Sequence, residues 1–225
     1  MNLEKCLKKS AVVVVLIALF TGCSVKTIAV SSDAKQNLSN KTFTFVKRTG
    51  PLGPQTLTPG KALAIGLTGG VGAAIMGATG GLDAEELATK IPGAYISTEL
   101  SKVFEEKYKM IKVLDNITTN ESDIDELVQT YDNVDYLIDT QDLLWQVVYY
   151  PFNWGTYSVR YIGTLKLIDI NSKKILAQGQ CQYFPDYTEN APTYDEIFLE
   201  DSKLLKQMTK EGLDVCIKKY ITEVL

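Results

Sequence analysis

The spacing of hydrophobic positions changes along the chain, and the changes predict an α+β fold. Apolar residues recur every three or four positions over 96–108 and 124–131, which is typical of amphipathic helices. The spacing becomes two after residue 134 and stays so to residue 183, with turns near 151–155 and 171–173, which predicts antiparallel strands. A helical spacing returns over 193–224. We therefore expect a mixed sheet with a C-terminal antiparallel meander, helices packed on one face, and a long C-terminal helix.

The first residues follow a different pattern, which is typical of a secretory signal peptide. Three lysines precede the apolar run Ala11 to Phe20, and the small residues Thr21-Gly22 lead into Cys23. A run of about ten residues is too short to span a bilayer, which needs roughly twenty. The stretch from Leu19 to Cys23 resembles the lipobox of bacterial lipoproteins, although Phe20 stands where that family most often has Leu. This resemblance implies cleavage before Cys23 and lipidation of its sulfur; the alternative is an ordinary cleaved signal with a chance cysteine.

The predicted cleavage sets the domain organisation and the compartment. We expect a signal peptide over 1–22, a polar tether over 23–40, and one periplasmic domain over 41–225. Two or three acyl chains on Cys23 make a stable membrane anchor. Ser24 follows the cysteine, where lipoproteins retained at the inner membrane often carry Asp. By resemblance to that sorting rule, the expected location is the outer membrane, facing the periplasm.

Charge and composition exclude several classes of function. Removal of the signal takes away three lysines and Glu4, which changes the formal net charge from −4 to −6. An acidic domain without a basic run argues against a nucleic-acid partner. The sequence contains no histidine, the commonest general base and metal ligand. We expect no metal, no cofactor and no enzymatic activity; the alternative is a hydrolase that uses the carboxylates of Asp135, Asp139 and Asp142.

Two further cysteines predict a disulfide. Cys181 and Cys216 remain as a pair in an oxidising compartment, where cysteines commonly form disulfides. The alternative is two buried free thiols. A bond would connect the C-terminal helix to the meander.

The most unusual segment is apolar and glycine-rich, from Ala62 to Leu82 within a predicted insert at 60–82. A nucleotide-binding loop is one interpretation, but the fragment 70–72 lacks the strand and acidic residue that such a loop needs. A second interpretation is a glycine-zipper helix that enters a membrane or forms a homo-oligomer. The third is a glycine-rich loop or buried hairpin. The zipper face would consist of residues at four-residue spacing: Gly69, Ala73, Gly77 and Gly81.

Aromatic residues gather around the turn at 151–155. We expect Trp145 and Tyr149 to belong to the core. The remaining three, Tyr150, Phe152 and Trp154, are the predicted contacts for a protein partner, because exposed aromatic side chains are common at interfaces.

Three stretches of the C-terminal half resemble known envelope proteins. The segments 161–169 and 177–181 are similar to a recurring sequence in uncharacterised proteobacterial lipoproteins, and 191–196 fits the start of their last helix. The order of elements resembles the α/β domain of ABC-transport auxiliary lipoproteins, of the Tol translocation protein and of the curli-secretion lipoprotein. The resemblance implies an accessory or binding component of an envelope assembly or transport system. It supplies no catalytic residue.

Overall fold

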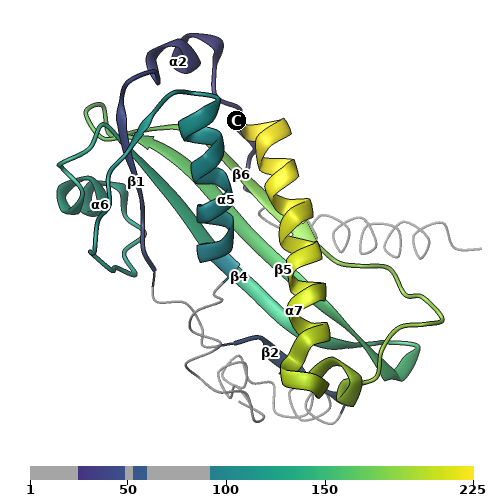
Figure 1. The fold of residues 1–225 in the computed structure, drawn as a ribbon. Helices are drawn as coiled ribbons and strands as arrows, with labels where there is room; N and C mark the ends of the chain where they lie inside the picture. Colours follow the sequence, from purple (N-terminus) through teal and green to yellow (C-terminus); the bar gives the residue numbers. More distant parts are fainter. Residues whose placement is uncertain (1–24, 49–52, 60–91) are drawn as a thin grey trace, which may run out of the picture.

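The fold is built on one mixed sheet, described by a computed structural model over residues 25–48, 53–59 and 92–225 (Figure 1). The signal peptide, Cys23, the glycine-rich segment and the residues just after it lie outside these ranges. The strand order is β3-β1-β4-β5-β6, and β2 also pairs with β4. The elements are α2 (Ser32–Asn37), β1 (Thr42–Phe45), β2 (Gln55–Leu57), α5 (Pro92–Glu106), β3 (Ile111–Lys112), α6 (Ile124–Thr130), β4 (Tyr136–Tyr150), β5 (Asn153–Asp169), β6 (Lys174–Tyr183), α7 (Tyr194–Lys219) and the π-helix η2 (Tyr220–Val224).

The predicted meander is confirmed. β4, β5 and β6 pair antiparallel along most of their length, whereas β1 pairs in parallel with β3 and β4. In β5 apolar side chains alternate with polar ones, which is typical of an antiparallel sheet that packs its core on one face. The predicted α+β class therefore follows directly from the strand pattern.

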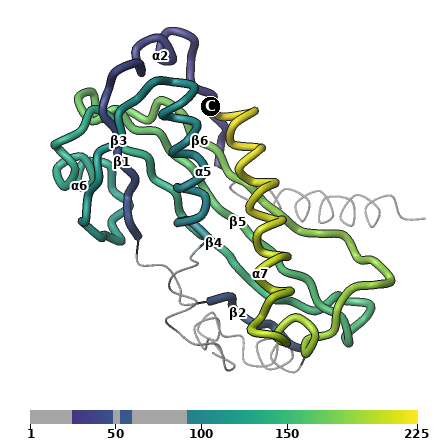
Figure 2. The backbone as a smooth tube through the Cα atoms, in the orientation of Figure 1, coloured from purple at the N-terminus to yellow at the C-terminus, as the bar shows by residue number. Residues whose placement is uncertain are grey.

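Helices α5 and α7 run across one face of the sheet, and the main core lies beneath them (Figures 1 and 2). Phe104 from α5 and Leu213 from α7 pack there with Leu165 and Leu167 of β5. The short helix α6 covers one end of the opposite face. A second, smaller core forms there from Val46, Leu127, Val128, Tyr131, Leu137 and Ile168. None of the described helices is long and apolar enough to cross a membrane.

The expected tether over 23–40 differs from the structure in its described part. Ile28 pairs with Gln178 of β6, and the Val30 N–H donates to the Val224 carbonyl at 2.8 Å. Val30 and Leu38 are buried in the main core, on either side of α2. Residues from Ile28 onward are thus part of the domain, because their few apolar side chains fill the space between the C-terminus and the sheet.

The two-residue spacing along β4 predicts Leu143 on the same face as Trp145 and Val147, but the structure places it elsewhere. A β-bulge lies between Asp142 and Leu144, so Leu143 has no partner on β5. The extra residue turns its side chain toward solvent, where it is 52% exposed, while Trp145 and Val147 are buried. The predicted C-terminal helix is present but contains a kink, with non-helical backbone from Leu199 to Ser202.

Candidate functional site

The turn between β4 and β5 presents two large aromatic side chains to solvent. Phe152 is fully exposed and Trp154 is 62% exposed. The Trp154 Nε1–H donates to the carbonyl of Pro151 at 2.8 Å, which orients the indole ring. Both residues therefore have the exposure that the sequence-based prediction requires.

The loop after β6 supports this tip from below. The Tyr150 hydroxyl donates to the Asp186 carbonyl at 3.1 Å, and its ring meets the ring of Tyr187 edge-on with centroids 5.1 Å apart. The Asn153 amide donates to the Tyr187 hydroxyl at 3.0 Å. Tyr150 was expected to be a partner contact, but it is buried. Its aromatic ring supports the turn, and a partner cannot reach most of it without displacing Tyr187.

Farther from the tip, the aromatic residues expected in the core lie there. Trp145 is buried and its Nε1–H donates to the Thr209 hydroxyl of α7 at 3.2 Å. Tyr149 is half-buried and packs against the main core. Only part of the aromatic cluster in the sequence is thus available to a partner.

Cys181 of β6 and Cys216 of α7 form a disulfide, with their Cα atoms 5.4 Å apart. Both side chains are fully buried in the main core. The predicted connection between the C-terminal helix and the meander is therefore present.

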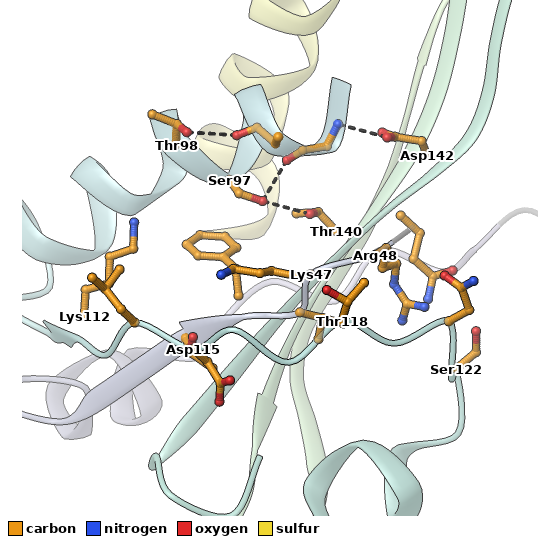
Figure 3. Close-up of a pocket in the computed structure, with 18 of the residues that line it drawn as sticks. Lys47, Arg48, Ser97, Thr98, Lys112, Asp115, Thr118, Ser122, Thr140 and Asp142 are labelled. Carbon is orange, nitrogen blue, oxygen red and sulfur yellow. Dashed lines mark hydrogen bonds between the residues drawn. The ribbon is translucent and has the colours of Figure 1, made fainter. Parts of the chain in front are cut away.

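A cleft of about 660 Å³ lies between the end of β1, the start of α5, the middle of β4 and the segment 112–122 (Figure 3). It occurs where β4 changes neighbours. β1 pairs with residues 136–138 of β4, and β2 pairs with residues 146–148. The intervening part of β4 has no partner on that edge among the described strands, and its side chains Thr140 and Asp142 line the cleft.

Arg48, which lines the cleft, belongs to a buried ion pair. Arg48 Nε lies 2.7 Å from Asp139 Oδ1, and the Asp139 side chain is completely buried. Gln141 Nε2 donates to the other carboxylate oxygen at 2.8 Å. Arg48 Nη2 is buried without a hydrogen-bond partner in the described part of the chain. The guanidinium therefore serves mainly to neutralise Asp139.

Asp142 forms the side of the cleft next to α5. Its Oδ2 accepts from the Gly93 N–H at 2.9 Å, and its Oδ1 accepts from the Tyr161 hydroxyl at 2.7 Å. Burial raises the pKa of the Asp142 carboxyl, and these two hydrogen bonds oppose that shift. Ser97 donates to the Gly93 carbonyl and lies 3.1 Å from the Thr140 hydroxyl (Figure 3). The polar groups here are largely paired with one another.

Asp135 lies apart from the cleft, at the start of β4. Its carboxylate accepts from the Thr42 N–H and hydroxyl, both at 2.8 Å, and pairs with Lys41 at 3.2 Å. The Thr42 N–H holds the pKa of Asp135 below its ordinary value. The three aspartates considered for hydrolysis thus have separate structural partners, and Asp142 alone among them lines the cleft. This geometry gives the hydrolase alternative no support.

The part of the chain that the structure describes contains no group of three or more His, Cys, Asp or Glu side chains placed to hold a metal ion. Sequence reasoning missed the cleft, Arg48 and Ser97 altogether. Neither residue stands in a motif, because the cleft arises where two short strands leave a gap along β4. No local sequence pattern predicts such a gap.

Comparison with known proteins identifies no family. No family model matches the chain, and no curated protein matches it. Among solved structures, it is similar to the hypothetical protein CT253 from Chlamydia trachomatis, at 10% identity and a TM-score of 0.39, over 82% of this chain and 99% of that one. The LpoB C-terminal domain from Salmonella enterica matches at 8% identity and a TM-score of 0.28, over 65% of this chain and 84% of that one. Lipoprotein GNA1162 from Neisseria meningitidis matches at 10% identity and a TM-score of 0.28, over 76% of this chain and 99% of that one. Values this low carry no argument about function.

Proposed function

We propose that this protein is a lipid-anchored, non-enzymatic binding protein of the bacterial cell envelope, and that a protein partner packs on its aromatic tip. The aromatic tip is defined here as Phe152 and Trp154. The observation that carries the proposal is that two large aromatic side chains stay exposed on a turn whose base is held by several contacts. An exposed aromatic pair of this kind has no evident role in the stability of the domain.

The contacts beneath the tip favour binding for an energetic reason. Association loses affinity when flexible side chains must become ordered. Trp154 is already oriented by its bond to Pro151, and the turn rests on the pair Tyr150–Tyr187. Aromatic residues, Trp and Tyr in particular, are enriched among the residues that contribute most to protein interfaces. Trp154 can therefore contact a partner with a small loss of conformational entropy.

The membrane part of the proposal rests on the sequence around Cys23. Its position after an apolar run and a small residue supports acylation, and Ser24 supports transport to the outer membrane with the domain in the periplasm. Mass spectrometry of the N-terminal peptide from the mature protein tests this part directly. Acyl chains on a peptide that begins at Cys23 are expected; an unmodified peptide would contradict the anchor.

The binding part is tested in two steps. A photo-crosslinking residue at position 152 of the full chain, expressed in cells, is expected to capture one protein that the same residue at Val215 does not capture. Val215 is a suitable control because it is an exposed apolar residue on α7.

The affinity of that protein is then measured with purified full-length variants. Phe152→Ala/Trp154→Ala is expected to weaken binding by roughly 100-fold, if each aromatic contributes an ordinary interface energy. The control Leu199→Ala/Val215→Ala should leave it unchanged. Equal affinity in both double variants, with unchanged circular dichroism, would refute the role of the tip.

A further inference from the structure

The N-terminal segment joins the domain at the edge strand β6. The Val25 N–H donates to Gln180 Oε1 at 3.3 Å, and Gln178 Nε2 donates to the Lys26 carbonyl at 2.9 Å. Ile28 and Gln178 exchange two backbone hydrogen bonds of 2.8 and 2.9 Å. These contacts hold the chain from Val25 onward against β6.

The side of the sheet on which this happens follows from the alternation of side chains. Ala177 and Cys181 of β6 face α7 and the main core. Gln178 and Gln180 therefore point to the opposite face, called the open face here because it lies away from α5 and α7, although Ser158 and Thr164 on it are buried. Val25 contacts the Gln180 side chain, so the first described residues lie close to this open face at its β6 edge.

The position of the lipid follows if Cys23 is acylated, a premise taken from the proposed function. Ser24 alone separates Cys23 from Val25, so their Cα atoms lie at most about 7 Å apart. Val25 is held on β6, and the link from Cys23 to Val25 is only two residues long. The domain therefore cannot lie far from the bilayer that holds the acyl chains. The membrane surface must lie beside the open face near β6.

This part of the open face carries positive charge, in contrast to the chain as a whole. Arg160 and Lys166 of β5 share the face, since Lys166 is paired across the strands with Gln178. Lys26 is exposed, and its carbonyl accepts the hydrogen bond from Gln178, which is paired with Lys166. Among the described residues that β4, β5 and β6 place on this face, the one carboxylate is Asp139, which is buried and ion-paired. Three cations thus lie along this side of a protein whose formal net charge is −4.

Arg160 adds one feature that suits an anionic surface. Its guanidinium lies over the ring of Phe184, 5.6 Å from the centroid, and Phe184 is half-exposed. A cation beside an exposed aromatic ring is common where proteins meet the headgroup region of a membrane.

We propose that the basic strip, defined as Lys26, Arg160, Lys166 and Phe184, lies against the anionic phospholipid surface that holds the acyl chains. Strands β5 and β6 then run along the membrane, and α5 and α7 face away from it. Helix α6 covers the other end of the same face and has acidic residues in its first turn. Their repulsion from anionic headgroups confines the contact to the β6 side.

The test uses the full, acylated chain in vesicles of phosphatidylcholine and phosphatidylglycerol at a ratio of about 7:3, so that the strip meets an anionic surface. A photo-crosslinking residue replaces Gln182, an exposed position on the same face, or Val215 on α7 as the matched control. Lipid adducts are quantified by mass spectrometry. We expect roughly threefold or more adduct at position 182 than at 215, with the difference reduced in pure phosphatidylcholine or at high salt.

A second variant tests the role of charge. Lys26→Ser/Lys166→Gln should lower the adduct at position 182 while the acyl anchor keeps the protein on the vesicles. Equal adducts at 182 and 215 in acylated protein would overturn the proposed orientation and leave the lipid anchor and the aromatic tip intact. An unacylated N-terminal peptide would instead contradict the anchor, and the orientation with it.

Discussion

Asp142, in the middle of β4, accepts a hydrogen bond from the Gly93 N–H at the start of α5, with 2.9 Å between the two atoms. The first N–H groups of a helix have no partner within it, and a carboxylate there is favoured by the helix dipole. Gly93 suits this contact, because a Cβ at its position would lie 3.1 Å from Asp142 Oδ2. The pair thus joins the helix to the sheet at one side of the cleft.

The raised pKa of Asp142 predicts a pH-dependent contribution to stability. A carboxyl whose pKa is higher in the folded than in the unfolded state contributes most below the unfolded value, near 4. This contribution is lost as the pH rises through the folded pKa. Asn resembles the protonated carboxyl, so in urea unfolding the stability of Asp142→Asn relative to wild type should increase from pH 3.5 to pH 7, as wild type loses this contribution. A relative stability of Asp142→Asn that falls toward pH 7 would contradict the assignment.

Asp135 predicts the opposite dependence. Hydrogen bonds from Thr42 and the charge of Lys41 lower its pKa in the folded state. Its contribution is present above the unfolded value and is lost as the pH falls through the folded one. Asp135→Asn should therefore destabilise the protein at pH 7 and have little effect near pH 2 in the same urea measurement. An equal decrease in the free energy of unfolding at both pH values would show that Asp135 acts through packing alone.

Arg48 is expected to be required for the stability of the fold, because its ion-pair partner Asp139 is completely buried. Arg48→Met leaves that charge without its partner, which typically lowers the free energy of unfolding by about 3–5 kcal/mol. Adding Asp139→Asn removes the uncompensated charge and should restore part of the loss. Urea unfolding of the two single variants and the double variant forms a complete cycle. If the double variant is as unstable as the sum of the two single variants, the ion pair does not couple these residues.

The disulfide predicts a large effect of reduction. Cys181 and Cys216 are 35 residues apart in the sequence, and a closed loop of that length stabilises by about 4 kcal/mol in the chain-entropy model. Cys181→Ala/Cys216→Ala should lower the melting temperature by several degrees or more, and reductant should lower it only in the wild type. An unchanged melting temperature in both would show that the covalent bond adds little to the packing of α7.

The hydrophobic pattern predicted the strands of the meander and the long last helix, because alternation and helical spacing are local properties of the chain. It placed Leu143 on the wrong side, since a single bulged residue reverses the alternation. It also missed the packing of Val30 and Leu38. Two apolar residues in a polar stretch give no periodic signal, although they fill a real space beside the C-terminus.

The sequence identified the aromatic residues of the candidate site but not which of them reach solvent. In the structure Phe152 and Trp154 are exposed, whereas Tyr150 is buried. That difference depends on the loop at 184–192, which folds back beneath the turn. The hypotheses about Cys23 and residues 62–82 concern positions outside the described ranges and stay predictions.

By itself the sequence determined the α+β class, the antiparallel meander and the pairing of Cys181 with Cys216, because each depends on local spacing or on a small choice of partners. Tertiary structure alone decided the cleft and the pairs around it. Arg48 and Asp139 are 91 residues apart, and Gly93 and Asp142 are 49 apart. Their contacts exist because β1 and β2 leave part of the β4 edge open and α5 begins beside it, and no pattern of neighbouring residues encodes that geometry.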